Sequence, residues 1–367
     1  MKASRSEIAI KEKRVREFLK AKGLSALCLT TSKNFAWFTC GGDNHVEITN
    51  RRGVSTAVLT ADDKFLVANN IEAGRMAAEE VEGQGFVVRE TPWHDDRRFE
   101  IIRELVGKGR IGTDWPFPGA EMVDGELSPL RYSLTPQEIQ RYKEVGRLTG
   151  LAVEQACRRV KPGRTEHEIG SLLARNLLAS GVLPAVILVA VDKRIQLYRH
   201  PIPTDRKMRK YAMLVACGRK WGLIASATRL ACLGKVPHQL AAKHDACTKI
   251  DAGFISRTHE GRQASWVLSK AIEDYAATGH ADQWRFHHQG GGTGYQTRDF
   301  LATMSCTERI RPNQAFAWNP SISGTKSEDT IVCTRKGPLI LTQIRGWPTI
   351  THEVDGVVVQ RPDILAL

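Results

Sequence analysis

The spacing of hydrophobic residues predicts a helix at the start of the chain. The apolar positions that fall on one helical face are Ile8, Val15, Phe18 and Leu19. Ser4 and Glu7 have the spacing of a capping box, in which each side chain bonds to the other residue's backbone at a helix start. Gly23 follows the last apolar position and is typical of a helix end.

The residues that follow, up to about 130, alternate between extended and helical patterns. A buried strand is expected at 24–30, and a hairpin is expected at 52–70, where an alternating pattern breaks at Ala61-Asp62-Asp63. The other elements expected in this part are a helix and two strands, at 97–109, 85–93 and 110–115. Strands that alternate with helices in this way indicate an α/β unit.

From about residue 133 the pattern changes to long helices followed by many strands. Thr135, Pro136 and Glu138 form a capping signal for one helix, and Thr165 opens a second. A further helix is expected at 263–279, and the extended segments are 185–191, 211–218, 222–234, 314–323, 327–337, 337–344 and 354–360. These helices should pack on a strongly bent, mainly antiparallel sheet. We therefore predict an α+β protein with two domains, residues 1–132 and 133–367.

Composition indicates a globular protein without a membrane partner. Hydrophobic residues make up 42% of the chain, yet no apolar run reaches the roughly 18 residues that span a bilayer. The first residues lack the apolar core of a signal peptide, so we expect a cytoplasmic location. The eight cysteines include no CxxC pair and lie in apolar surroundings, which favours reduced, buried thiols.

The net charge of +13 would suit an acidic ligand or a nucleic acid. The densest basic cluster, residues 204–210, has no interleaved aromatic residues on which bases could stack. We therefore interpret the charge as a solvated surface and do not expect nucleic acid as a partner.

Several short motifs, in the same order as in a known family, cover essentially the whole chain. TSKNFAWFT (31–39) is similar to T-S-x-N-x-x-Y-L-T-G, and VKPGRTEHEI (160–169) to K-P-G-x-T-E-x-E-I. GLIASATR (222–229) is similar to G-Y-x-S-D-x-T-R, and KSEDTIVCT (326–334) to R-x-E-D-T-x-x-V-T. The chain thus resembles the creatinase / aminopeptidase P / prolidase family. The resemblance implies an N-terminal creatinase-like α/β domain, a C-terminal pita-bread domain and a homodimer.

Most positions at which this family binds two metal ions carry residues that do not bind metals. By the resemblance, two aspartates, a histidine and a glutamate are replaced by Val215, Ser226, Gly291 and Asn319. Only Glu328 keeps a carboxylate, and the proton-shuttling histidine becomes Arg298. Two dications about 3.5–4 Å apart repel by roughly 20 kcal/mol at an effective dielectric of 20, and one carboxylate does not neutralise them. We expect no dimetal centre and no cofactor.

His200 and Glu328 are the first candidates for proton transfer. By the resemblance, His200 lies where the family has a substrate-contacting histidine and where creatinase has its acid/base. Glu328 would bind a substrate cation or act as an acid, because burial of a lone carboxyl group raises its pKa. Its neighbour Asp329 should point to the opposite face of the strand and serve the fold.

The stretch HHQGGGTGYQTRD, residues 287–299, supplies further candidates. Because alternate residues of a strand face opposite sides, we expect only one of His287 and His288 to line the site. The glycines at 290–292 would allow a ligand to approach the backbone, and Arg298 would hold a substrate carboxylate. The predicted catalytic residues are His200, Glu328 and His288, and the predicted substrate-binding residues are Arg298, His287, Asn319, Ser226, Gly291 and Tyr295.

Three functional interpretations remain open, each with a small amino-acid-like molecule or a short peptide as ligand. The first is a metal-independent, creatinase-like hydrolase or lyase that cleaves a C–N bond in a small amino or amidino acid. The second is a catalytically inactive peptide-binding protein, because by resemblance the fold also serves in a histone-chaperone subunit. The third is an Xaa-Pro-peptidase-like enzyme with a rearranged single-metal site, built from Glu328 with His200, His287 or His288.

Overall fold

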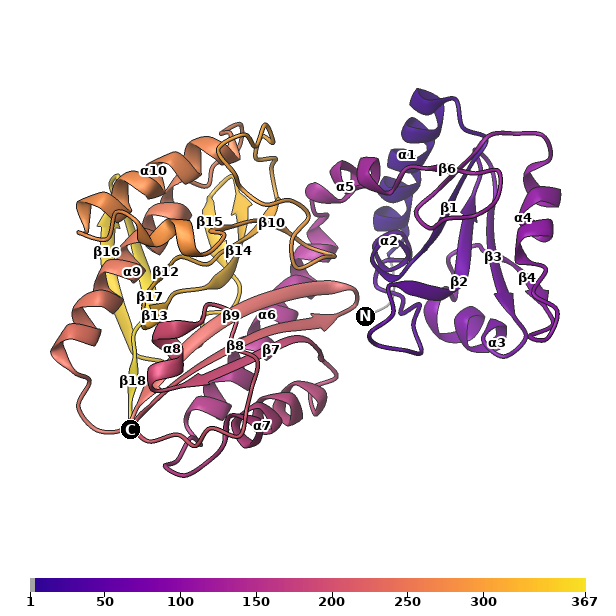
Figure 1. The fold of residues 1–367 in the computed structure, drawn as a ribbon. Helices are drawn as coiled ribbons and strands as arrows, with labels where there is room; N and C mark the ends of the chain where they lie inside the picture. Colours follow the sequence, from indigo (N-terminus) through magenta and orange to yellow (C-terminus); the bar gives the residue numbers. More distant parts are fainter. Residues whose placement is uncertain (1–3) are drawn as a thin grey trace. The chain divides into compact units, whose positions relative to one another are not determined.

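The computed structural model describes residues 4–367, and the chain divides into two compact units (Figure 1). The N-terminal unit ends at Arg131, and the C-terminal unit extends from Tyr132 to Leu367. Within the described residues, no helix is both long enough and apolar enough to cross a membrane. All eight cysteines are free, and only Cys306 is not fully buried, which confirms the expectation of buried thiols.

A six-stranded mixed sheet forms the N-terminal unit, in the order β4-β3-β2-β1-β5-β6. Its strands are β1 (Ala26–Thr31), β2 (Arg52–Leu59), β3 (Lys64–Asn69), β4 (Val87–Thr91), β5 (Ile111–Thr113) and β6 (Glu121–Met122). Its helices are α1 (Arg5–Lys22), α2 (Ser32–Phe38), α3 (Ala73–Arg75), the π-helix η1 (Met76–Glu80), α4 (Arg98–Val106) and α5 (Asp124–Tyr132). These elements confirm the predicted α/β unit, including its hairpin between β2 and β3.

Local sequence signals set the ends of the predicted helices. In α1 the Ser4 hydroxyl accepts a hydrogen bond from the Glu7 N–H at 3.2 Å, and Gly23 ends the helix with a φ of 62°. The first two helices of the next unit begin with the predicted capping boxes at Thr135 and Thr165. The short helix α2 was not predicted, because its sequence SKNFAWF is rich in aromatic and polar residues of modest helix propensity.

Two four-stranded sheets form the C-terminal unit, in the orders β18-β9-β8-β7 and β10-β11-β14-β15. The strands of the first are β7 (Leu183–Val191), β8 (Tyr211–Lys220), β9 (Leu223–Cys232) and β18 (Leu365–Ala366). Those of the second are β10 (Gly290–Thr293), β11 (Ala315–Trp318), β14 (Asp329–Thr334) and β15 (Gly337–Ile340). Two hairpins are added, β12 (Ser321–Ile322) with β13 (Thr325–Lys326) and β16 (Thr349–Val354) with β17 (Val357–Pro362).

The two sheets meet where the backbone of Thr228 in β9 bridges to Glu328, immediately before β14. The Thr228 N–H donates to the Glu328 carbonyl oxygen at 3.0 Å. Among the strand pairs of this unit, only β18 with β9 is parallel. The prediction of a bent, mainly antiparallel sheet is therefore confirmed, and the seam between its halves carries Glu328.

Helices cover both halves of this layer (Figure 1). They are α6 (Pro136–Cys157), α7 (Glu166–Leu178), α8 (Lys193–Leu197), α9 (His238–Arg257), α10 (Ala264–Ala277) and the 3₁₀ helix η2 (Gln283–Phe286). One core joins α6 and α7 to β7–β9, and a second joins α9 and α10 to β11 and β14. The helix α9 escaped prediction because its buried face carries His244, Thr248 and Asp251 among the apolar residues, which weakens the hydrophobic periodicity.

A buried ion network connects the second half of the layer to its neighbours. Arg361 Nη2 lies 2.6 Å from carboxylate oxygens of both Asp251 and Asp329, and Arg229 Nη2 lies 2.8 Å from Asp329. All four side chains are at most 1% exposed. Asp329 thus has the structural role that was expected for it, on the side of the chain away from Glu328.

We predict that Asp329→Ala lowers the free energy of unfolding by about 3–5 kcal/mol, because it removes the carboxylate that the buried guanidinium groups of Arg229 and Arg361 share. Glu273→Ala is the control, because that carboxylate is 63% exposed in its pair with Lys270 and should change stability by less than about 0.5 kcal/mol. Calorimetric unfolding of both variants checks this. Equal, small losses would show that the network does not support the fold.

Candidate active site

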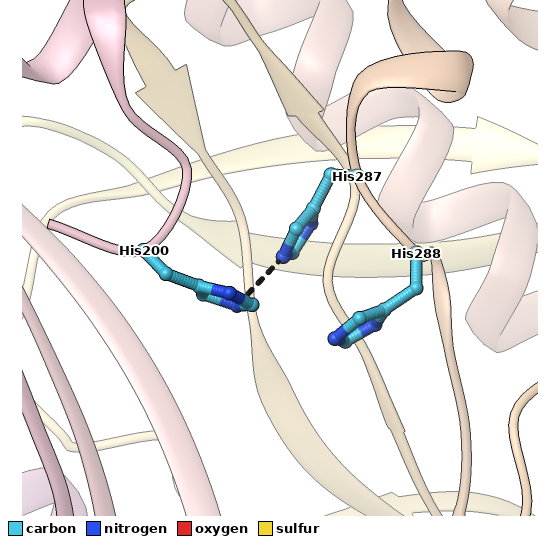
Figure 2. A group of neighbouring side chains, drawn as sticks. All are labelled: His200, His287 and His288. Carbon is cyan, nitrogen blue, oxygen red and sulfur yellow. Dashed lines mark hydrogen bonds between the residues drawn. The ribbon is translucent and has the colours of Figure 1, made fainter.

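Three histidines from two distant segments meet in the C-terminal unit (Figure 2). His200 lies in the loop between α8 and β8, whereas His287 and His288 directly follow η2. The Nε2 atoms of His200 and His287 share a hydrogen bond of 3.0 Å, and the rings of His287 and His288 stack with centroids 4.5 Å apart. One nitrogen from each ring lies within 4.8 Å of the other two. We call these residues the histidine trio.

The prediction that only one of His287 and His288 would reach the site is wrong. It assumed a strand, but the 3₁₀ helix ends at Phe286 and β10 begins only at Gly290. Side chains in the irregular segment between them do not alternate, so both rings turn toward His200 (Figure 2). His287 is buried and His288 is exposed.

Two glutamine side chains hold the segments of the trio in place. The Gln283 side-chain oxygen accepts hydrogen bonds from Arg199 Nη2 at 2.8 Å and from the Ser323 N–H at 2.9 Å, which ties the His200 loop to η2. The Gln289 amide donates to the His287 carbonyl oxygen at 2.7 Å and accepts from the Tyr275 hydroxyl at 2.8 Å. These bonds fix the positions of the two segments that carry the imidazoles.

The surroundings keep the trio uncharged. Burial, then the positive charge of Lys326, lowers the pKa of His287 to about 2. Burial, then Arg298, lowers the pKa of His288 to about 4, and burial followed by Lys326 also lowers the pKa of His200. Each ring is thus neutral near pH 7, with one N–H and one lone pair. In the bond between His200 and His287 one ring donates its N–H and the other accepts it, and a ring whose lone pair is not used in this way can accept a proton.

Glu328 is an anion, so the expectation of a raised pKa is wrong. Its carboxylate is 2% exposed, and burial alone would raise the pKa. However, Lys326 Nζ lies 2.8 Å from Oε2 and Arg298 Nη2 lies 3.4 Å from Oε1, and the Thr228 hydroxyl donates to Oε2 at 2.7 Å. These partners lower the pKa of Glu328 to about 2. A carboxylate that is already paired twice is neither an acid nor a free site for a substrate cation.

Lys326 is a residue of the candidate site that the sequence analysis missed. It is 4% exposed and contacts the Glu328 carboxylate. A signal was present, because residues two apart in an extended segment lie on the same face, and Lys326 precedes Glu328 by two positions. We call Lys326, Glu328 and Arg298 the cation–carboxylate group; its formal charge is +1.

The side chains of Arg298 and Ser226 contact other residues of the same chain. Arg298 was expected to hold a substrate carboxylate, but its Nη2 contacts Glu328 and its Nη1 donates to the Thr297 carbonyl oxygen at 2.5 Å. The Ser226 hydroxyl lies 3.2 Å from Cys217 Sγ, and burial raises the pKa of that thiol, so Cys217 is not a thiolate nucleophile. Arg298 could still share a second anion with Lys326, whereas Ser226 is fully buried.

Asn319 is buried, and its side-chain oxygen has no hydrogen-bond partner among the described residues. Its backbone acts on His287, where it opposes the fall in pKa, as a carbonyl oxygen does when it stabilises a protonated ring. Asn319 therefore lies next to the histidine trio, as a neutral group.

Tyr295 and Gly291 serve the fold, which corrects their predicted role in substrate binding. The Tyr295 hydroxyl donates to Glu138 Oε1 at 2.7 Å, in the capping box of α6. A Cβ on Gly291 would lie 2.2 Å from the Phe300 carbonyl oxygen, and one on Gly290 would lie 2.1 Å from that of Ala317. The glycines allow the chain's own backbone to pack closely, so no space is left there for a ligand.

The two-metal centre that the resemblance implies does not fit these residues. Val215 packs in an apolar cluster with Leu188 and Met213. The other replaced positions offer a hydroxyl bonded to a thiol, no side chain and a neutral amide. The remaining carboxylate is paired with two cations, which would repel a further four positive charges.

Comparisons with known proteins agree with this fold. Sequence models of metallopeptidase family M24 and of the creatinase/prolidase N-terminal domain match residues 140–335 and 12–121. The chain is 17% identical to the solved dipeptidase PepE from Mycobacterium ulcerans, with a TM-score of 0.78 over 100% of this chain and 99% of that one. It is 16% identical to the Xaa-Pro dipeptidase from Bacillus anthracis, with a TM-score of 0.79 over 98% and 100%.

The N-terminal domain of the FACT complex subunit SPT16 from chickpea (Cicer arietinum) is similar as well, at 13% identity and a TM-score of 0.68 over 92% of this chain and 97% of that one. No curated protein sequence matches the chain. At such identities the solved structures establish the fold, and they confirm a creatinase-like domain followed by a pita-bread domain.

We predict that the C–H resonances of the His287 and His288 rings show no protonation between pH 8 and about 5 in NMR titrations of the chelator-treated protein, because burial and the nearby cations lower both pKa values. The unfolded chain takes up these protons near pH 6.5, so below that pH the free energy of unfolding should fall, by at most about 1.4 kcal/mol per pH unit for the buried His287 and by less for the exposed His288. A titration midpoint near pH 6.5 for His287 would contradict the described environment.

Proposed function

The chain belongs to metallopeptidase family M24, and from that premise we propose that it hydrolyses a C–N bond in a small substrate without the two-metal centre of its family. The substrate is an amino or amidino acid or a dipeptide with a free carboxylate. The dipeptidase and Xaa-Pro dipeptidase structures with the same fold support a substrate of this size. The assembly that the resemblance implies is a homodimer.

One observation carries the proposal: Glu328 is held between Lys326 and Arg298. In a two-metal site the carboxylates balance the charge of the ions. Here two side-chain cations take that place, and they leave the group with a formal charge of +1. The group therefore favours one more anion, such as a substrate carboxylate, and disfavours dications.

The histidine trio supplies the proton transfer. His200 is neutral, and its Nε2 lies 3.0 Å from Nε2 of His287, so the hydrogen bond holds the ring in one orientation. With His200 as base, a water molecule loses a proton to the ring and its oxygen attacks the carbon of the C–N bond. The protonated His200 then donates to the departing nitrogen, so one water is consumed and the imidazole returns to its neutral form.

The cation–carboxylate group positions the substrate in this scheme. Lys326 and Arg298 bind the substrate carboxylate, and Glu328 keeps both cations oriented while it remains ionised. This replaces the earlier assignment of Glu328 as an acid. Fixed charges on a buried frame orient a small substrate without the cost of rearranging it.

A panel of dipeptides and amidino acids, with the matching carboxamides, tests the substrate class. Turnover should require the free carboxylate, and it should persist after dialysis against a chelator, because no step uses a dication. Loss of activity on chelation, with recovery on adding two equivalents of a divalent ion, would refute metal independence.

We predict that His200→Gln lowers kcat by at least about 100-fold with little change in KM, because it removes the proton acceptor. His238→Gln, a substitution at an exposed histidine at the start of α9, is the matched control and should leave both constants unchanged. If both variants keep full activity, His200 is not the base.

We also predict that Lys326→Met raises KM for carboxylate substrates by about tenfold or more and has a smaller effect on the carboxamides, since a charge-assisted hydrogen bond contributes about 1.5–3 kcal/mol. Steady-state kinetics on paired substrates measure this difference. Equal losses on carboxylates and carboxamides would mean that Lys326 serves only to neutralise Glu328.

Peptide binding without catalysis is the second candidate, and the fold shared with the SPT16 domain favours it. In that case a peptide ending in a carboxylate would bind to the cation–carboxylate group without being cleaved. The two candidates differ at His200, because His200→Gln would abolish turnover in an enzyme and would leave the affinity of a binding protein almost unchanged.

A further inference from the structure

We propose that the histidine trio binds a single transition-metal ion of the zinc type, through side chains other than those that the resemblance assigns to the family's metal pair. The site would use one nitrogen from each of His200, His287 and His288 and would leave a fourth position open (Figure 2).

The geometry of the three nitrogens fits such an ion. A tetrahedral zinc with Zn–N bonds of about 2.0–2.1 Å holds its nitrogen ligands roughly 3.3 Å apart. The Nε2 atoms of His200 and His287 are 3.0 Å apart, and all three donor atoms lie within 4.8 Å. His200 and His287 are thus nearly at the required spacing, and the exposed ring of His288 would complete the set by bringing its nitrogen closer to theirs.

The second ring nitrogen of His287, Nδ1, supports this role. When Nε2 binds a metal, the proton sits on Nδ1, and metal-binding histidines usually donate that proton to a carbonyl or carboxylate. Among the described residues, His287 Nδ1 is buried and has no hydrogen-bond partner, and the Asn319 backbone opposes the fall in the pKa of this ring, as a nearby acceptor does. Metal binding would fix the tautomer that places the proton on Nδ1.

The chemistry of the donors and of the neighbours selects the class of ion. Three imidazole nitrogens favour zinc, cobalt, nickel or copper over magnesium and calcium, which require oxygen ligands. The neighbouring cation–carboxylate group has a formal charge of +1, which weakens dication binding and favours an anion as the fourth ligand. The expected fourth ligand is therefore hydroxide or the carboxylate of a small molecule.

Metal binding has a consequence that rests on the proposed function, whereas the binding itself does not. The ion would take the lone pair of His200, which the proposed mechanism uses to accept a proton. One equivalent of zinc should therefore inhibit the hydrolase.

The experiment is a titration of the chelator-treated full chain with Co²⁺ at pH 7.5, followed by visible absorption. We expect the intense bands of tetrahedral cobalt to saturate at one equivalent and to be displaced by Zn²⁺. His288→Ala, a substitution at the exposed ligand, should weaken cobalt binding at least tenfold, and His200→Ala with His287→Ala should abolish it. His238→Ala is the matched control and should bind like the parent chain.

Unchanged cobalt affinity in His288→Ala, or no saturable band in the parent chain, would overturn the proposed metal site. Circular dichroism of each variant checks that the fold is intact. Hydrolysis assays with one equivalent of Zn²⁺ separate the two proposals. Inhibition supports both. If chelation abolishes hydrolysis and a single ion per chain restores it, the result supports the metal site and refutes metal independence. If cobalt does not bind, the proposed metal site is wrong, while the hydrolase proposal stands.

Discussion

The site depends on a buried carboxylate that two cations share. Glu328 lies at the seam between β9 and β14, and it is ionised because Lys326 and Arg298 contact its two oxygens. Removal of either cation would leave a buried negative charge less well paired, and removal of Glu328 would leave two positive charges facing each other. Burial first, and then the charges of nearby Lys326 or Arg298, lower the pKa of the three histidines. The same two cations make the environment unfavourable for a pair of dications.

The arrangement shows how one fold can support different chemistry. The C-terminal unit has the fold of metallopeptidase family M24, and in this chain the backbone of Thr228 bridges to Glu328. Two side-chain cations, Lys326 and Arg298, balance the charge of that carboxylate. Beside them, Gln283 and Gln289 hold the segments that carry the histidine trio. The proton transfer and the metal binding that we propose at the histidine trio both depend on this frame.

Much of the fold could be predicted from the sequence, and the site could be predicted only in part. Capping residues such as Thr135 and Thr165 fixed the helix starts, and the order of short motifs identified the two domains. The helix α9 was missed because polar residues such as Asp251 occupy its buried face. The resemblance singled out His200 and Glu328, and the stretch 287–299 added His287 and His288, but neither predicted the pairing that sets the ionisation of Glu328. Lys326 could have been found from its spacing, whereas the approach of Arg298, thirty residues away, depends on tertiary structure.

The central claim is that Glu328 binds cations of the protein and not metal ions. Anomalous diffraction from a crystal soaked in excess Co²⁺ tests it most directly. We predict no peak within coordination distance of Glu328, where Lys326 and Arg298 should remain in place, and at most one peak, among the histidines. Two cobalt peaks about 3.5–4 Å apart and bridged by Glu328, with Lys326 displaced, would contradict the account.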